Sequence, residues 1–183
     1  MTPPELKLQY RGPRKEHQVF AVDLGKHKIG ISTGIVRDGR ESAVLVDAVT
    51  LQHPKRGRAT PDEVADMVLD WVEANTKCDK VVFVAEWPMK YKNRRDLHAD
   101  IDSLLAVGAA LHRKGVRWRK KWYPAQWKGN VPKVPHHRRL RKALTDRETA
   151  RLKQLHPQGL GHDALDALGI FLFAVGRTKR GGV

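Results

Sequence analysis

The chain has 183 residues, of which 40% are hydrophobic and 30% are charged. This length suits a single domain with one sizeable core, and the hydrophobic fraction excludes global disorder. Lys and Arg number 35 against 20 Asp and Glu, so the formal net charge is +15 and we expect a polyanionic partner. The single cysteine, Cys78, excludes an internal disulfide and any cysteine-rich zinc module.

No segment has the pattern of a membrane anchor. The longest apolar run, Ile170 to Val175, is far shorter than the roughly 20 residues that cross a bilayer. The N-terminal sequence lacks the apolar core of a signal peptide, and we find no basic amphipathic helix with aromatic anchors. We therefore expect a soluble, cytoplasmic protein without a membrane partner.

The chain ends differ from its middle. Residues 1–17 carry three prolines and mixed charge without hydrophobic periodicity, which is typical of a mobile, basic arm. We expect residues 18–177 to form one folded domain and residues 178–183 to form a basic tail.

Three strands are predicted at the start of the domain. The apolar run Val19 to Val22 ends in an acid, Asp23, and Gly25 lets the chain turn into a second strand, Ile29 to Ile35. Alternating apolar residues then predict a third strand from Ser42 to Val49. Consecutive short connections make these strands antiparallel.

A helix and a buried strand come next. Thr60, Pro61 and Glu63 form a helix start, with an N-cap, a proline at the first helical position and a capping-box acid. One face of this helix is apolar, with Val64, Met67, Val68, Trp71 and Val72. The nearly continuous apolar run Lys80 to Glu86 is typical of a strand that is buried on both faces, and it again ends in an acid.

The second half of the chain is predicted to contain more helix. The predicted elements are a helix from about Asp96 to Lys114, a strand from Val116 to Tyr123, an irregular basic segment from Pro124 to Arg141, a helix from Asp146 to Leu155 and a final helix from His162 to Val175. Thr145 and Glu148 form the predicted capping box of the helix from Asp146 to Leu155.

Four carboxylates lie where carboxylates are unusual. Asp23 and Glu86 each end an apolar strand, and Asp163 and Asp166 share one face of an otherwise apolar helix. If the two strands are neighbours and the helix crosses their ends, all four meet at one point. Such a cluster repels itself unless cations neutralise it, and oxygen ligands suit Mg²⁺ or Mn²⁺.

Each acid also has a simpler interpretation. Asp23 is compatible with an ordinary turn, Glu86 with an exposed strand end, and Asp163 and Asp166 with favourable charges in the first turn of a helix. The coincidence of all four in suitable elements of a strongly basic chain favours the metal site.

Three motifs carry a family resemblance: VDLG at residues 22–25, VAE at 84–86 and DALDAL at 163–168. With them the sequence resembles the RuvC-type Holliday junction resolvases of the RNase H-like superfamily, in particular divergent phage-borne members. The resemblance spans about residues 18–177. Between Tyr123 and Leu160 basic and aromatic residues replace the pattern of the bacterial enzymes, which leaves substrate preference open.

The resemblance implies an α/β, RNase H-like fold with a five-stranded mixed sheet in the order 3-2-1-4-5, flanked by helices, with Asp23 on the central strand. It implies two Mg²⁺ or Mn²⁺ ions held by Asp23, Glu86, Asp163 and Asp166, and no nucleotide cofactor. The expected activity is metal-dependent resolution of four-way DNA junctions by paired phosphodiester hydrolysis that leaves 5′ phosphates. Because a junction presents two symmetry-related strands, we expect a homodimer, with the helix from Asp96 to Lys114 as part of its contact.

Basic and aromatic residues near these acids are candidate DNA contacts, although a solvated loop is the simpler interpretation of each. They are Lys26, Lys28, Lys90, Tyr91, Lys92, Arg94, Arg95, Trp127, Lys128, Arg138 and Arg139. Tyr91 is a candidate wedge between bases and Trp127 a candidate stacking platform, whereas Trp71, Trp118 and Trp122 are expected in the core. His162, beside the acid pair, is a candidate catalytic auxiliary.

Two other hypotheses remain open. One is an RNase H-like nuclease acting on flaps, forks or RNA–DNA hybrids. The other is a non-catalytic nucleic-acid-binding relative, which the intact set of four acids disfavours. An ATP-binding fold of the actin and sugar-kinase type also begins with a strand, an Asp and a Gly, but it needs two such domains, and this chain is too short to supply them.

Overall fold

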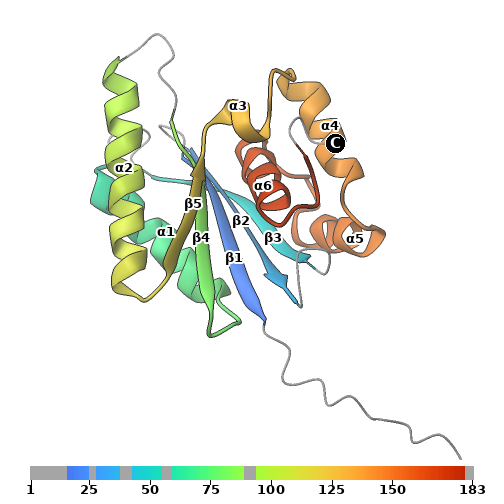
Figure 1. Cartoon of the computed structure of the whole chain (residues 1–183), viewed down its shortest axis with the longest axis horizontal. Coiled ribbons are helices and arrows are strands. Elements are labelled where there is room, and N and C mark those ends of the chain that lie inside the picture. Colours follow the sequence, from blue (N-terminus) through green and yellow to red (C-terminus); the bar gives the residue numbers. More distant parts are fainter. Residues whose placement is uncertain (1–15, 25–27, 38–42, 55–58, 89–93, 180–183) are drawn as a thin grey trace, which may run out of the picture.

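A five-stranded mixed sheet forms the centre of the computed structural model, which describes residues 16–24, 28–37, 43–54, 59–88 and 94–179. The strand order is β3-β2-β1-β4-β5 (Figure 1). Strand β1 pairs antiparallel with β2 and parallel with β4, β2 pairs antiparallel with β3, and β4 pairs parallel with β5. This topology and the central position of β1 confirm the predicted fold class.

The strands are β1 (His17–Leu24), β2 (Lys28–Val36), β3 (Val44–Gln52), β4 (Val81–Glu86) and β5 (Arg117–Trp122). The helices are α1 (Pro61–Asn75), α2 (Arg94–Arg113), α3 (Pro124–Trp127), α4 (Lys133–Lys142), α5 (Asp146–Leu155) and α6 (His162–Ala174).

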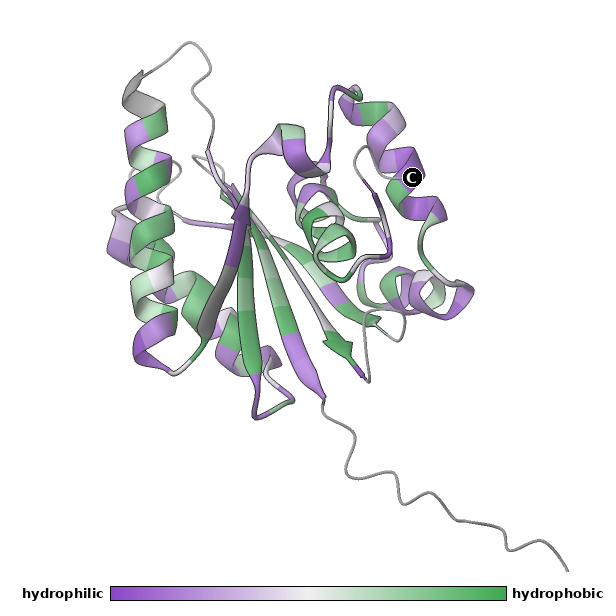
Figure 2. Ribbon diagram, in the orientation of Figure 1, coloured by the Kyte–Doolittle hydropathy of each residue, from purple (hydrophilic) through white to green (hydrophobic). Residues whose placement is uncertain are grey.

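The period of two along β1 builds two separate cores. Val19 and Ala21 belong to the core under α6, whereas Phe20 and Val22 belong to the core under α1 and α2. Helices therefore cover both faces of the sheet, which explains why β1 and β4 are continuous apolar runs. In Figure 2, β4 and much of the sheet's centre are hydrophobic, whereas α4 and α5 are largely hydrophilic.

Helix α6 is buried almost all round, because every residue from Ala164 to Leu172 is buried. It lies close against β2, where a Cβ at Gly30 would come within 1.9 Å of the Asp163 carbonyl oxygen. The Ser32 hydroxyl donates to the Ala167 carbonyl over 2.8 Å, and the Ala164 N–H donates to the Thr50 hydroxyl oxygen over 3.1 Å. These contacts fix the start of α6 over the sheet.

Both predicted capping boxes are present. The Thr60 hydroxyl accepts from the Glu63 N–H at the start of α1, and Thr145 does the same for Glu148 at the start of α5. Glu148 also accepts from the Leu45 N–H over 2.7 Å and pairs with Arg177 at 2.6 Å. The second cap thus ties α5 to β3 and to the chain after α6.

The prediction of an irregular segment from Pro124 to Arg141 is wrong, because most of it is the helices α3 and α4. Most residues of α4 are charged or polar, so the sequence shows no clear apolar face there. The buried side of the helix has few residues, among them the fully buried Leu140. Helix α2 begins at Arg94 rather than at Asp96. No helix within the described residues is long and apolar enough to span a membrane.

The packing at Gly30 predicts a specific loss of stability. Gly30→Ala should lower the free energy of unfolding by about 3 kcal/mol, because its Cβ would overlap the Asp163 carbonyl and push α6 from the sheet. Urea denaturation measures this. The control is Gly115→Ala, whose Cβ meets nothing within 4 Å and whose φ of 77° costs about 1 kcal/mol. Equal losses in the two variants would contradict the close approach.

Candidate active site

Asp23 and Glu86 are placed by the alternation of their strands. Asp23 lies two residues after Ala21 and Glu86 two residues after Val84, and both of these apolar residues face α6. The parallel ladder pairs Val22 with Ala85, so the two acids follow at the same level. They are therefore neighbours on the α6 face, at the ends of β1 and β4.

The start of α6 brings the second pair of acids to the same place. Gly30 is paired with Asp23 in the β1–β2 ladder, and the Asp163 carbonyl lies directly over Gly30. Asp166 follows three residues later on the same side of the helix. The predicted convergence of four acids from β1, β4 and α6 is thus what the packing produces.

The pKa values of the strand acids reflect this crowding. Burial raises the pKa of Asp23 well above its usual value, and the charges of Glu86, Asp166 and Asp163 raise it further. Burial also raises the pKa of Glu86 to about 7, against the opposing effect of a hydrogen bond from Trp127. Both carboxylates therefore ionise more readily when positive charge is added.

Asp166 is already surrounded by donors. His137 Nε2 lies 2.8 Å from Asp166 Oδ1, Lys133 Nζ lies 3.0 Å from Oδ2, and Lys128 Nζ lies 3.5 Å from Oδ1. Burial alone would raise the pKa of Asp166, but the hydrogen bonds from His137 and Lys133 and the charges of Lys128 and Lys133 hold it below its usual value. Asp166 therefore stays ionised.

The prediction that Trp127 stacks on DNA bases is wrong. Its side chain is 1% exposed and packs against α6 at Gly169, so a base has no access to the indole ring. Instead, Trp127 Nε1–H donates to Glu86 Oε2 over 2.8 Å. Trp127 is a core residue that orients an acid, while Trp122 is buried as expected.

Sequence reasoning missed His137. It is buried, contacts Asp166, and stacks on His162 with ring centroids 5.4 Å apart. The pKa of His137 is lowered by burial, against the effect of its hydrogen bond to Asp166. The i, i+4 spacing of Lys133 and His137 would have placed both on one helix face, had α4 been recognised. The catalytic role of His162 stays a prediction.

The chemistry of the acids fits a hard divalent cation, because all four offer carboxylate oxygens and their mutual repulsion is relieved by positive charge. Within the described part of the chain, however, no three His, Cys, Asp or Glu side chains are placed so that they could hold one metal ion together.

A groove of about 440 Å³ adjoins the acids. It is lined by Asp163 and His162 at the start of α6, and by Lys28 and Thr50 on the sheet. Lys28 is exposed, as a phosphate contact must be. The rest of the groove's lining comes from the end of β3 and from the loop between α5 and α6.

The other predicted DNA contacts are placed unevenly. Lys128 lies at Asp166, whereas Arg138 and Arg139 are exposed on α4. Arg94 and Arg95 begin α2. Four of the predicted contacts lie outside the described residues, namely Lys26, Lys90, Tyr91 and Lys92. Apart from Trp127, these contacts stay predictions.

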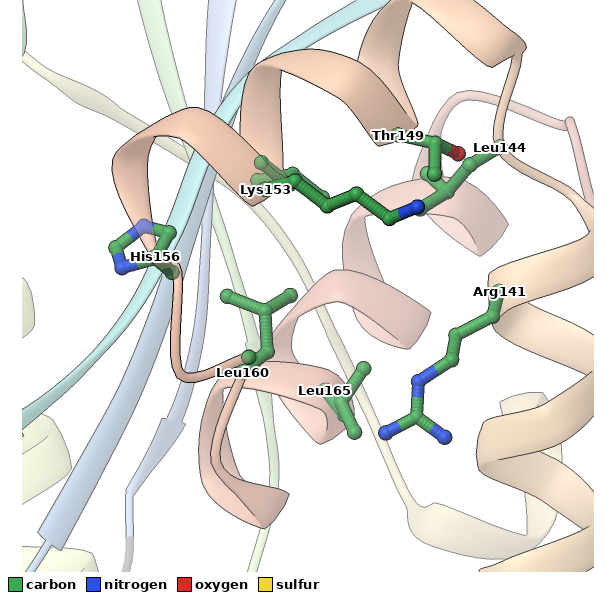
Figure 3. A pocket seen from close by; sticks show the side chains of 9 residues that line it. Arg141, Leu144, Thr149, Lys153, His156, Leu160 and Leu165 are labelled. Carbon is green, nitrogen blue, oxygen red and sulfur yellow. The ribbon is translucent and has the colours of Figure 1, made fainter.

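A second hollow does not belong to this site. It is a cavity of about 210 Å³ among α4, α5 and α6, and it contains none of the four acids. Figure 3 shows Leu144, Leu160 and Leu165 lining it, with Arg141 and Lys153 beside them. This apolar lining is unsuited to metal or phosphate chemistry, so the acid cluster is the candidate active site.

The solved structures that resemble this fold include two of RuvC. One is a Thermus thermophilus RuvC structure, with 18% sequence identity, a TM-score of 0.60, and coverage of 88% of this chain and 98% of that chain. The other is T. thermophilus RuvC in complex with Holliday junction substrate, with 16% identity, a TM-score of 0.52, and coverage of 89% and 98%. No protein-family model and no curated protein matches the sequence.

The chain therefore has an RNase H-like fold of the RuvC type. At this level of identity, the likeness concerns the fold. The resemblance to phage-borne members stays a prediction, because neither structure is informative about the source of the chain.

The pKa of Glu86 predicts a pH-dependent stability of the metal-free protein. Its usual value is 4.5 and its value in the folded chain is about 7. Below about pH 4.5 both states hold the proton. Between these values only the folded state holds it, so Glu86 makes folding less favourable as pH rises, up to a constant penalty above about pH 7.

Glu86→Gln should therefore raise the free energy of unfolding by about 1–3 kcal/mol at pH 8 in EDTA, and the gain should vanish near pH 4. Urea denaturation at both pH values measures this. The matched control is Glu73→Gln on α1, whose side chain is 51% exposed. A gain that is the same at pH 4 and pH 8 would refute the buried, shifted carboxyl.

Proposed function

We propose that this protein is a metal-dependent endodeoxyribonuclease that resolves four-way DNA junctions. The observation that carries the proposal is the convergence of Asp23, Glu86, Asp163 and Asp166 at one end of a sheet with a RuvC-type fold. A likeness to a RuvC structure that contains Holliday junction substrate supports branched DNA as the partner. The reaction is paired hydrolysis of phosphodiesters, and it leaves 5′ phosphates.

The four acids would hold the ions, which we propose to be two Mg²⁺ or Mn²⁺. Bound there, they would supply an activated water and stabilise the leaving 3′ oxygen. The contribution of the protein's other residues is to position the carboxylates. Trp127 orients Glu86 through its indole N–H, and His137 orients Asp166. The burial of both donors keeps these two carboxylates from turning away.

The charge of the chain supports a DNA ligand. The net charge is +15, although the candidate site itself is acidic. Lys28 lines the groove next to Asp163, and Arg138 and Arg139 are exposed on α4. Basic side chains around an acidic centre suit a phosphate backbone that must approach metal-bound carboxylates.

We also propose a homodimer, because a four-way junction presents two symmetry-related strands for cleavage. Helix α2 is the candidate contact, and its outer face carries Leu105, which is 54% exposed, together with the exposed Ala109. An exposed leucine beside a small residue permits close packing of two helices.

The deciding assay offers purified protein a mobile junction, an immobile junction, a fork, a flap, an RNA–DNA hybrid and a linear duplex, with and without Mg²⁺. The expected result is paired, symmetric nicks in the junctions that require the metal. Preferred cleavage of forks, flaps or hybrids would favour the wider class of RNase H-like nucleases. Unselective cutting of the duplex would eliminate the resolvase hypothesis.

Removing one acid should abolish this activity without unfolding the protein. Asp23→Asn and Asp166→Asn are each expected to lower the rate of junction cleavage by at least about a hundredfold, because each removes a charged metal ligand. The matched control is Asp70→Asn, a change at an exposed position of α1. Cleavage at the rate of the unmodified protein by either acid variant would show that the site is elsewhere.

Lys28→Ala tests the groove as a DNA path. It should weaken junction binding in EDTA and lower the slope of log K against log salt by about one, because one phosphate contact is lost. Fluorescence anisotropy over a salt series measures both. Lys77 is an exposed residue that follows α1 and lies at the opposite end of the sheet, so Lys77→Ala should alter neither quantity. If both variants behave alike, Lys28 contributes only general charge.

A further inference from the structure

Two lysines contact Asp166, and Lys133 comes closer than Lys128. The Lys133 ammonium lies 3.0 Å from Asp166 Oδ2. Its pKa is raised, because the hydrogen bond to Asp166 and the charges of Asp166, Asp163 and Asp23 outweigh the effect of burial. The same ammonium lowers the pKa of Glu86. One flexible side chain thus interacts with all four acids.

Asp166 offers little room for a further partner while this contact persists. Oδ1 is contacted by His137 at 2.8 Å and by Lys128 at 3.5 Å, and Oδ2 is contacted by Lys133. The Asp166 side chain is 8% exposed. A cation that binds Oδ2 where the ammonium lies displaces Lys133 and leaves the two contacts at Oδ1 in place.

Lys133 is the donor that moves most easily. Asp166 lies in the buried helix α6, and the His137 side chain is 3% exposed, so neither can turn away without opening the core. The Lys133 side chain is 45% exposed and belongs to the first residue of α4. Its long stem can swing outward at the cost of one half-exposed ion pair.

We propose that Lys133 serves as the internal cation of the acid cluster, leaving Asp166 when a divalent ion binds and contacting a DNA phosphate at the site once it is released. The inference rests on the proposed function of the four acids as a metal site. Lys133 and the metal then exclude each other at Asp166. Lys133 is a positioning residue that couples metal binding to phosphate binding.

The first test measures Mn²⁺ binding to the metal-free, full-length protein from the electron paramagnetic resonance signal of free Mn²⁺. Lys133→Met keeps the stem and removes the charge, so it should lower the Kd for Mn²⁺ by about tenfold. Lys142→Met, at the exposed end of α4, is the matched control and should bind like the unmodified protein. An unchanged or higher Kd in Lys133→Met would overturn the exclusion.

A variant of an acid separates this result from the proposed function. Asp23→Asn should weaken Mn²⁺ binding whether or not Lys133 is present. If Asp23→Asn binds Mn²⁺ like the unmodified protein, the acid cluster is not the metal site and the proposed function fails as well. If Asp23→Asn loses binding while Lys133→Met gains none, only the role of Lys133 is refuted.

The second test concerns the released ammonium. Anisotropy of a labelled four-way junction is measured in EDTA and in Ca²⁺. Lys133→Met should weaken binding about threefold to tenfold in Ca²⁺, and by less than about twofold in EDTA, where Asp166 holds the ammonium. The same loss under both conditions would overturn the transfer of Lys133 from Asp166 to phosphate.

Discussion

Four carboxylates crowded at one end of a buried sheet repel one another, and the surrounding structure can be understood as the means of holding them there. Burial raises the pKa of Asp23, and the charges of the other three acids raise it further. Coulomb repulsion between such groups grows as water is excluded, so the arrangement needs nearby positive charge or proton uptake. The chain provides both, through Lys128 and Lys133 at Asp166 and through the raised pKa of Glu86.

Close backbone packing makes this crowding unavoidable. Gly30 lets the carbonyl of Asp163 lie against β2, and Gly169 lets the ring of Trp127 lie against α6. Two glycines thus bring the sheet, α6 and α3 to within contact distance of one another. Trp127 fills the remaining space and donates to Glu86. The same packing that builds the core therefore also orients the Glu86 carboxylate, as a rigid scaffold should.

The segment between β5 and α6 supplies side chains that contact Glu86 and Asp166. Sequence patterns lose the family resemblance there, yet the structure places its side chains at the acids: Trp127 from α3, Lys128 after it, and Lys133 and His137 from α4. Groups that hydrogen-bond a carboxylate in this way fix its orientation.

The sequence alone determined most strands and helices, the placement of the four acids at two strand ends and at the start of the last helix, and the two helix caps, because hydrophobic period, strand-ending acids and capping pairs are local patterns. The strand order was implied by the family resemblance, and the structure confirms it. Only the tertiary structure decided what surrounds the acids. Trp127 seemed suited to stacking on bases because its sequence neighbours are basic, but it is buried against α6, which follows more than thirty residues later. His137 and Lys133 were likewise assigned to an irregular segment, and their contacts with Asp166 depend on how α4 docks. Burial and long-range contact are properties of packing, which local pattern does not encode.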